Sequence, residues 1–160
     1  NLDNINNIFF NNFGLGEKED NLPFYSYIRN NDGASSLLKR IDFDNTQIQT
    51  GFIKIKTLEN YTKNNKIQNI DLLCMDVQGY ELNVLKGAGN FIKNINFIIM
   101  EEPKPIINTL YLPNGIHSKY INSPTSQEIK IFMKEQGFVE IERIEENKIE
   151  DNVMYKNIRI

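Results

Sequence analysis

The sequence predicts an α/β fold with a mainly parallel sheet that ends in a carboxyl-terminal antiparallel hairpin. Two apolar runs, residues 70–75 and 96–100, are typical of buried parallel strands, and a helix signal lies between them. Near the end of the chain, the β-rich residues 138–144 and 153–158 flank a charged turn and predict two paired strands. Strands that alternate with helices before a final hairpin indicate the α/β class.

Length and composition predict one domain over residues 1–160. The chain is 40% hydrophobic and 24% charged, and it has no internal repeat or Gly/Ser-rich linker. Its formal net charge of -3 offers no general attraction for nucleic acid or anionic lipid. No apolar run reaches the roughly 18 residues of a membrane span, and no signal peptide is visible. Cys74 is the single cysteine and cannot form an intramolecular disulfide, so we expect a reducing, cytoplasmic setting and no membrane partner.

The amino-terminal half is predicted to contain three short strands and a helix. Residues 8–13 and 22–28 are β-rich runs on either side of a turn-prone, charged segment. Residues 52–55 predict another strand, whose alternate side chains point to opposite faces. Thr57 is the expected N-cap of a helix that continues to about Asn64.

The middle of the chain places carboxylates at the ends of two predicted strands. The first strand ends at Asp76 and the second at Glu101. After Asp76, Gly79 permits a tight turn into a helix. Ligands of open parallel sheets bind at the carboxyl ends of the strands, so Asp76 is a candidate base, metal ligand or acceptor for a cofactor hydroxyl. The structural alternative is that Asp76 caps the following helix. Glu101 and Glu102 together are more typical of a solvated turn than of a catalytic pair.

The carboxyl-terminal part begins with a long irregular stretch, residues 103–122, that contains three prolines and is too long for a simple connector. Thr125 and Glu128 then form a capping-box pattern, and the helix that they start should end before Gly137.

Other candidate motifs are weaker. His117 is the only histidine, and with one distant cysteine it supports neither a zinc cluster nor a Cys/His dyad, so we expect no metal. Residues 14–16 lack the third glycine of a dinucleotide-binding turn. The stretch Asp-Phe-Asp-Asn-Thr at residues 42–46 is similar to the paired-aspartate motif of haloacid dehalogenase-like phosphatases, which would require Mg²⁺ and a buried strand before Asp42.

Residues 70–88, Ile-Asp-Leu-Leu-Cys-Met-Asp-Val-Gln-Gly-Tyr-Glu-Leu-Asn-Val-Leu-Lys-Gly-Ala, resemble the signature of FkbM-family methyltransferases, I-D-L-L-K-I-D-V-E-G-x-E-L-x-V-L-x-G-A. Flanking segments resemble further elements of the family, so the resemblance covers nearly the whole chain. These segments are residues 33–37, 57–59, 97–101, 135–138 and 153–155.

The resemblance implies a Rossmann-like class I methyltransferase fold that uses S-adenosyl-L-methionine. It implies transfer of a methyl group to a hydroxyl of a sugar or natural product, so the partner would be a small-molecule or glycan acceptor. Asp76 matches the acidic position after the family's fourth strand, and with Glu101 it would be catalytic. Phe13 and Gly14, at the end of the third strand, would lie near the adenine, and together with Asp76 and Gln78 they would bind the cofactor. Tyr111 and Tyr120 are candidates for contact with a sugar.

The chain departs from the family pattern in two ways. Cys74 replaces the usual lysine, and Gln78 replaces a glutamate, so it can form hydrogen bonds but cannot act as a carboxylate. The family's first strand, glycine-rich turn, helix and second strand have no counterpart, so we expect a domain truncated at its amino terminus, with its amino-terminal strands missing. A missing amino-terminal segment or a second copy of the chain would then complete the sheet. A catalytically inactive methyltransferase-like binding or assembly module is the alternative function.

Overall fold

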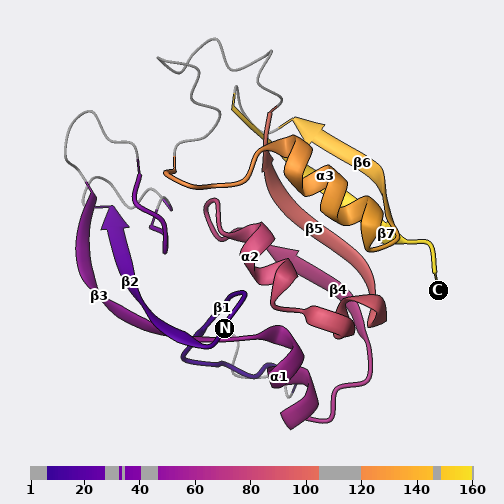
Figure 1. Ribbon diagram of the computed structural model, residues 1–160, viewed down its shortest axis with the longest axis horizontal. Helices are drawn as coiled ribbons and strands as arrows, with labels where there is room; N and C mark the ends of the chain where they lie inside the picture. Colours follow the sequence, from indigo (N-terminus) through magenta and orange to yellow (C-terminus); the bar gives the residue numbers. More distant parts are fainter. Residues whose placement is uncertain are drawn as a thin grey trace.

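The chain forms two β-sheets and three α-helices in the residues that the computed structural model describes. A β-hairpin that belongs to the smaller sheet stands beside the larger sheet and its helices (Figure 1). The described residues are 7–27, 33, 35–40, 47–104, 120–145 and 149–159.

The smaller sheet has three strands in the order β1-β3-β2, which are β1 (Gly14–Leu15), β2 (Asp20–Tyr27) and β3 (Gln47–Lys56). β1 runs parallel to β3, and β2 pairs with β3 in an antiparallel hairpin. Alternation in β3 places Ile55 in the core and leaves Phe52 exposed, which confirms the predicted faces of residues 52–55. The predicted strand over residues 8–13 is wrong: residues 8–12 are exposed and outside any strand, and pairing begins only at Gly14.

The larger sheet has four strands in the order β4-β5-β7-β6. β4 (Ile70–Met75) and β5 (Ile95–Pro103) are parallel, and β6 (Phe138–Glu145) and β7 (Glu150–Asn157) form the predicted terminal hairpin. Because β7 pairs antiparallel with β5, this sheet is mixed, as the smaller sheet is. The prediction of a mainly parallel sheet is therefore wrong. Among the described strands, two of the five pairs, β2–β3 and β6–β7, join strands that follow each other in the sequence, and both are antiparallel.

The helices are α1 (Leu58–Asn64), α2 (Glu81–Lys86) and α3 (Ser126–Glu135), with a 3₁₀ turn, η1, at Gly89–Asn94. Both predicted caps are confirmed. The side chain of Thr57 accepts a hydrogen bond from the backbone N–H of Asn60, and Thr125 forms a reciprocal capping box with Glu128.

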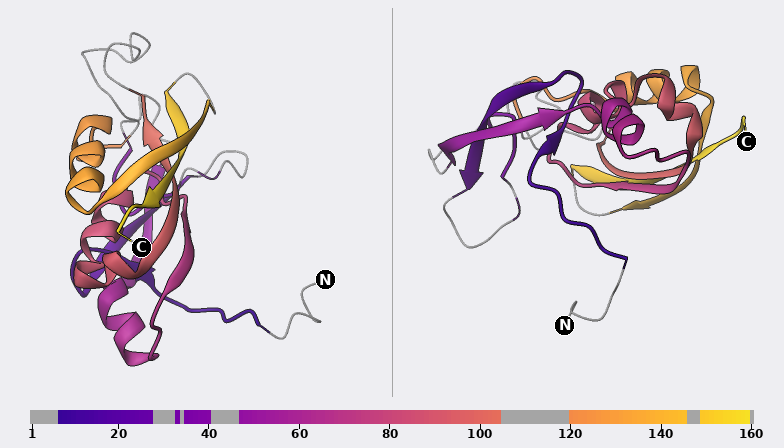
Figure 2. Two further views of the ribbon diagram at one scale, coloured as in Figure 1. Left: turned by 90° about the vertical axis from the view of Figure 1, so that its right-hand side faces the viewer. Right: turned by 90° about the horizontal axis from the view of Figure 1, so that it is seen from below.

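The core lies between one face of the larger sheet and helices α2, η1 and α3, which Figure 2 shows on the same side of the strands. Apolar side chains from both layers are fully buried there, including Leu85, Ile92, Ile95, Ile98, Met100, Ile129, Met133 and Val153.

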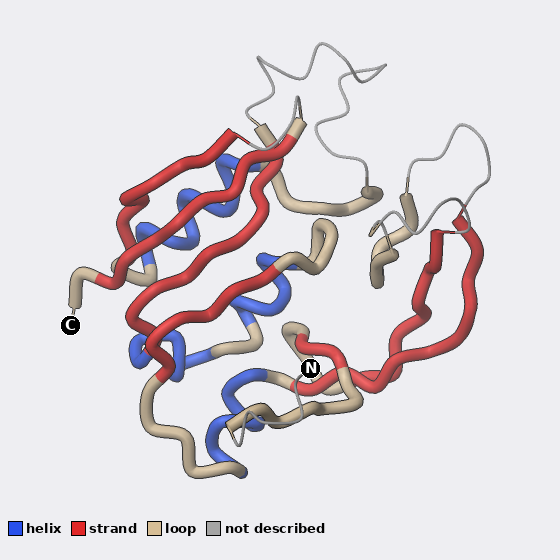
Figure 3. The backbone as a smooth tube through the Cα atoms, turned by 180° about the vertical axis from the view of Figure 1, so that it is seen from behind, coloured by secondary structure: helices blue, strands red, loops and turns tan. Residues whose placement is uncertain are grey.

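The opposite face of this sheet is uncovered by any described helix, as the view from behind shows (Figure 3). Leu72 is 49% exposed there, and Cys74 is exposed as well. β4 pairs only with β5 among the described strands. The expectation that residues 70–75 form a buried strand is therefore wrong for this face, although the bounds of the strand are as predicted.

No helix in the described parts of the chain combines the length and the apolar character needed to cross a membrane.

Candidate functional site

Asp76 lies directly after β4, as predicted, and its side chain is exposed. It does not cap α2, because the N-cap position is Tyr80 and no side chain caps that helix. The turn is instead stabilised by Glu81, whose Oε1 accepts hydrogen bonds from the backbone N–H groups of Val77 (3.1 Å) and Gly79 (3.3 Å). The carboxylate of Asp76 is therefore available to a ligand.

Gln78 connects the two predicted catalytic carboxylates. Its Nε2 donates to Asp76 Oδ1 at 2.6 Å and to Glu101 Oε2 at 3.4 Å. The hydroxyl of Tyr120 donates to Gln78 Oε1 at 2.5 Å, and the hydroxyl of Ser36 donates to the Gln78 backbone carbonyl at 2.8 Å. Asp76 and Glu101 therefore lie side by side near the carboxyl ends of adjacent parallel strands, although β5 continues past Glu101 to Pro103 and does not end at Glu101 as predicted.

The backbone of this turn is left-handed at two successive residues, with φ of 53° at Gln78 and 91° at Gly79. A Cβ on Gly79 would lie 3.1 Å from the Ser123 side chain and 3.2 Å from that of Tyr120, so glycine is needed both for its conformation and for close packing. The turn is thus pressed against the segment that leads into α3.

A pocket of about 220 Å³ opens between the two sheets, next to Asp76. Gly14, a predicted cofactor-binding residue, lines it together with Asp76, whereas Phe13 does not. The ring centroids of Phe13 and Tyr61 lie 5.4 Å apart, and the ammonium group of Lys56 lies 4.3 Å from the centroid of the Phe13 ring. The other lining residues are Leu15, Phe24, Ser35, Ser36, Leu37, Ile53, Val77 and Tyr80.

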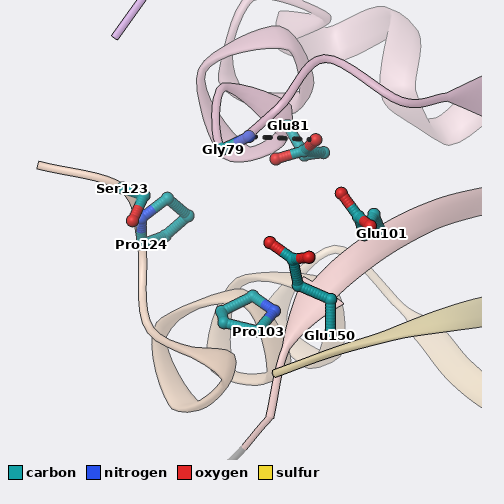
Figure 4. A pocket seen from close by; sticks show the side chains of 7 residues that line it. All are labelled: Gly79, Glu81, Glu101, Pro103, Ser123, Pro124 and Glu150. Atoms are coloured by element: carbon teal, nitrogen blue, oxygen red, sulfur yellow. Dashed lines mark hydrogen bonds between the residues drawn. The ribbon is translucent and has the colours of Figure 1, made fainter. Parts of the chain in front are cut away.

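A second, water-sized cavity of about 10 Å³ lies beside Gly79 of this turn (Figure 4). The carboxyl groups of Glu81, Glu101 and Glu150 surround it. Burial raises the pKa of Glu81 to about 7, and the nearby charge of Asp76 adds to this shift. Among the described residues, no three His, Cys, Asp or Glu side chains are placed to hold a metal ion.

Glu102 is not part of a solvated turn, so that interpretation of residues 101–102 is wrong. It belongs to β5 and is fully buried, because strand alternation continues the inward series of Ile98 and Met100. Its carboxylate accepts hydrogen bonds from Arg143 Nη2 (3.1 Å) and from the hydroxyl of Tyr155. Burial is the main cause that raises the pKa of Glu102, and these partners oppose the shift. This network ties β5 to β6 and β7 and gives Glu102 a structural role.

Several predicted candidates lie outside the described residues. These are His117, Tyr111, the aspartate motif at residues 42–46, and most of residues 103–122. The sequence reasoning missed Ser36, Glu81 and the hydrogen bond from Tyr120 to Gln78, and the candidate contact of Tyr120 with a sugar stays a prediction. The match of residues 33–37 to a family element was the one signal that pointed to Ser36, and no local pattern indicated the contacts of Glu81 or Tyr120.

Asp76, at the end of β4, lines a mostly apolar pocket and lies close to Glu101 of β5, and α/β proteins bind their ligands at this edge of the sheet. The model of the methyltransferase FkbM domain matches residues 1–140, so the chain belongs to this family of methyltransferases. Neither the curated proteins nor the solved structures gave a significant match.

Proposed function

We propose that this chain takes part in the S-adenosyl-L-methionine-dependent methylation of a hydroxyl group on a small-molecule or glycan acceptor. Membership of the FkbM family supports methyl transfer in general. The observation that carries the proposal is the position of Asp76, an exposed carboxylate at the end of β4 that also lines the pocket between the sheets.

The residues around this pocket fit the nucleoside part of the cofactor. Leu15, Phe24 and Ile53 offer apolar surface to a purine, and Asp76 can accept hydrogen bonds from hydroxyl groups. Burial, together with the charges of Glu17 and Asp20, raises the pKa of Tyr80, so its protonated hydroxyl can donate a hydrogen bond to a ligand.

The pocket does not account for the whole cofactor. Its volume of about 220 Å³ lies below the roughly 300–1,000 Å³ of complete ligand sites. The described lining residues also include no cation that could pair with a carboxylate of the ligand. The pocket therefore supports binding of one part of the molecule, and residues beyond the described lining would hold the rest.

The proposed methyl transfer requires few chemical groups from the chain's own residues. When bound, S-adenosyl-L-methionine supplies an electrophilic methyl group on a sulfonium. The acceptor oxygen would form a bond to that carbon as the carbon–sulfur bond breaks and leaves a neutral thioether, and Asp76 would receive the hydroxyl proton. The remaining task is to hold the acceptor hydroxyl in line, so most of the rate would come from positioning.

Calorimetric titration with S-adenosyl-L-methionine and with S-adenosylhomocysteine tests this proposal. We expect Asp76→Asn to weaken binding of the cationic S-adenosyl-L-methionine about tenfold, equivalent to about 1.4 kcal/mol, and to weaken binding of the neutral thioether less. Asp71→Asn is the matched control, since Asp71 lies on the same strand and accepts a hydrogen bond from Asn96. Absence of binding to the wild-type chain, or equal effects of the two substitutions, would contradict the proposal.

The alternative function is a non-catalytic methyltransferase-like module for binding or assembly. The observation that favours it is the exposed apolar surface of β4, an edge strand among the described residues. A second copy or an additional segment could pair with this edge. Light scattering that detects stable association, together with a failure to bind S-adenosyl-L-methionine, would support this alternative.

A further inference from the structure

We propose that Gln78 is a positioning residue, whose neutral side-chain amide holds Asp76 and Glu101 together as a pair of ionised carboxylates. This inference rests on the proposed function only where it concerns binding of S-adenosyl-L-methionine. The arrangement of the three side chains is a separate claim that can be tested without that ligand.

The first step of the argument is electrostatic. Two carboxylates that share one site repel each other, so a hydrogen-bond donor between them lowers the cost of holding them close. The amide nitrogen of Gln78 carries two hydrogens and lies within hydrogen-bond distance of both carboxylates, at 2.6 Å from Asp76 and 3.4 Å from Glu101. It can therefore stabilise both negative charges without adding a charge of its own.

The second step is the orientation of the amide. Tyr120 donates its hydroxyl proton to Gln78 Oε1, so the oxygen end of the amide is already occupied. A flipped amide would point its oxygen at the carboxylates of Asp76 and Glu101, which as ionised groups have no proton to donate. Only one orientation satisfies all three partners.

The third step is the rigidity of the backbone that carries the amide. Gln78 adopts a positive φ of 53°, and its carbonyl is held by the Ser36 hydroxyl at 2.8 Å. The next residue, Gly79, has a positive φ of 91° and packs closely against Tyr120 and Ser123, so a Cβ there would crowd both side chains. Three segments that are distant in sequence thus fix the place where the amide meets the carboxylates.

A double-mutant cycle tests whether Gln78 acts through Asp76. Gln78→Met keeps a similar length but removes every side-chain hydrogen bond, and we expect it to weaken binding of S-adenosyl-L-methionine about tenfold. In the Asp76→Asn background the same substitution should have almost no further effect. The matched control is Gln68→Met, which makes the same change at an exposed position just before β4. Wild-type affinity in Gln78→Met, or fully additive losses in the double variant, would overturn the inference.

A second experiment is independent of the cofactor. Gln78→Glu would place a third carboxylate beside Asp76 and Glu101, and clustered carboxylates bind Mn²⁺. We expect electron paramagnetic resonance to show Mn²⁺ bound at least tenfold more tightly by Gln78→Glu than by wild type, and the gain to disappear when Asp76→Asn is added. Thermal unfolding of each variant verifies that it is folded.

The two experiments separate the claims. If the wild-type chain does not bind S-adenosyl-L-methionine but Gln78→Glu gains the Mn²⁺ site, the proposed function fails while the arrangement of Asp76, Glu101 and the residue-78 side chain stands. If a folded Gln78→Glu variant gains no Mn²⁺ binding, the two carboxylates are not held together, and the positioning role is refuted whatever the cofactor result.

Discussion

Replacement of Glu81 by glutamine should stabilise the protein at pH 8 and change its stability little at pH 4. Glu81 is only 3% exposed, and burial raises its pKa from 4.5 to about 7. Its Oε1 accepts two backbone hydrogen bonds, and the amide oxygen of glutamine can accept the same two. The substitution therefore removes a buried charge while it keeps the turn between β4 and α2.

The sign and size of the effect follow from proton linkage. Between pH 4.5 and about 7 the folded protein holds a proton on Glu81 that the unfolded chain has released, so the free energy of unfolding falls as the pH rises. This stabilising contribution is fully present below the pKa that Glu81 has in the unfolded chain. It is lost once the pH exceeds the pKa that Glu81 has in the folded protein. The gap between 4.5 and about 7 corresponds to about 3 kcal/mol.

Urea unfolding at several pH values and constant ionic strength measures this effect. The quantity of interest is the free energy of unfolding of Glu81→Gln minus that of wild type, since other titrating groups largely cancel in the difference. We expect the difference to grow by about 3 kcal/mol between pH 4 and pH 8, with most of the change below pH 7. The matched control, Glu135→Gln, makes the same change at an exposed position of α3 and should show a much smaller pH dependence.

A flat difference across this pH range would refute the reasoning, because it would mean that Glu81 titrates alike in the folded and unfolded chains. A variant that is less stable at every pH would show instead that the second carboxylate oxygen has a role that glutamine cannot supply.

Three further substitutions test the packing. Gly87→Ala would place a Cβ 1.9 Å from the Gly16 carbonyl oxygen, so we expect a loss of more than about 3 kcal/mol in urea unfolding, and a near-neutral result would disprove this contact. Thr125→Ala removes half of the capping box of α3 and should cost about 1 kcal/mol in the same assay; no loss would mean that the box does not stabilise the helix. Leu72→Lys adds a charge to the exposed face of β4, so light scattering should detect less self-association at high protein concentration. The thermal unfolding midpoint should stay nearly unchanged. A large drop in that midpoint would show that Leu72 is buried.

The sequence predicted those features that depend on neighbouring residues. The bounds of β4, the caps at Thr57 and Thr125, and the turn at Gly79 each follow from a few adjacent side chains. The placement of Asp76 and Glu101 at one edge also followed, because it needs only two strands that run in the same direction.

The features that were missed depend on contacts between distant parts of the chain. Tyr120 and Ser36 each reach Gln78 across 42 residues, and no local pattern encodes such a contact. Glu102 was assigned to a solvated turn because two adjacent glutamates are usually exposed. In the structure it is buried by the alternation of β5, and its partner Arg143 lies 41 residues further along the chain, where no local pattern indicates it. The predicted strand over residues 8–13 is wrong for a related reason, since a β-rich segment becomes a strand only where a neighbouring strand pairs with it.

The exposed position of Cys74 has a practical consequence. It is the only thiol in the chain, and it lies on the uncovered side of β4, two residues before Asp76. A fluorophore or spin label attached to the native protein would therefore sit at a single known location without any engineered residue. Its signal would report directly when another molecule covers this side of the sheet.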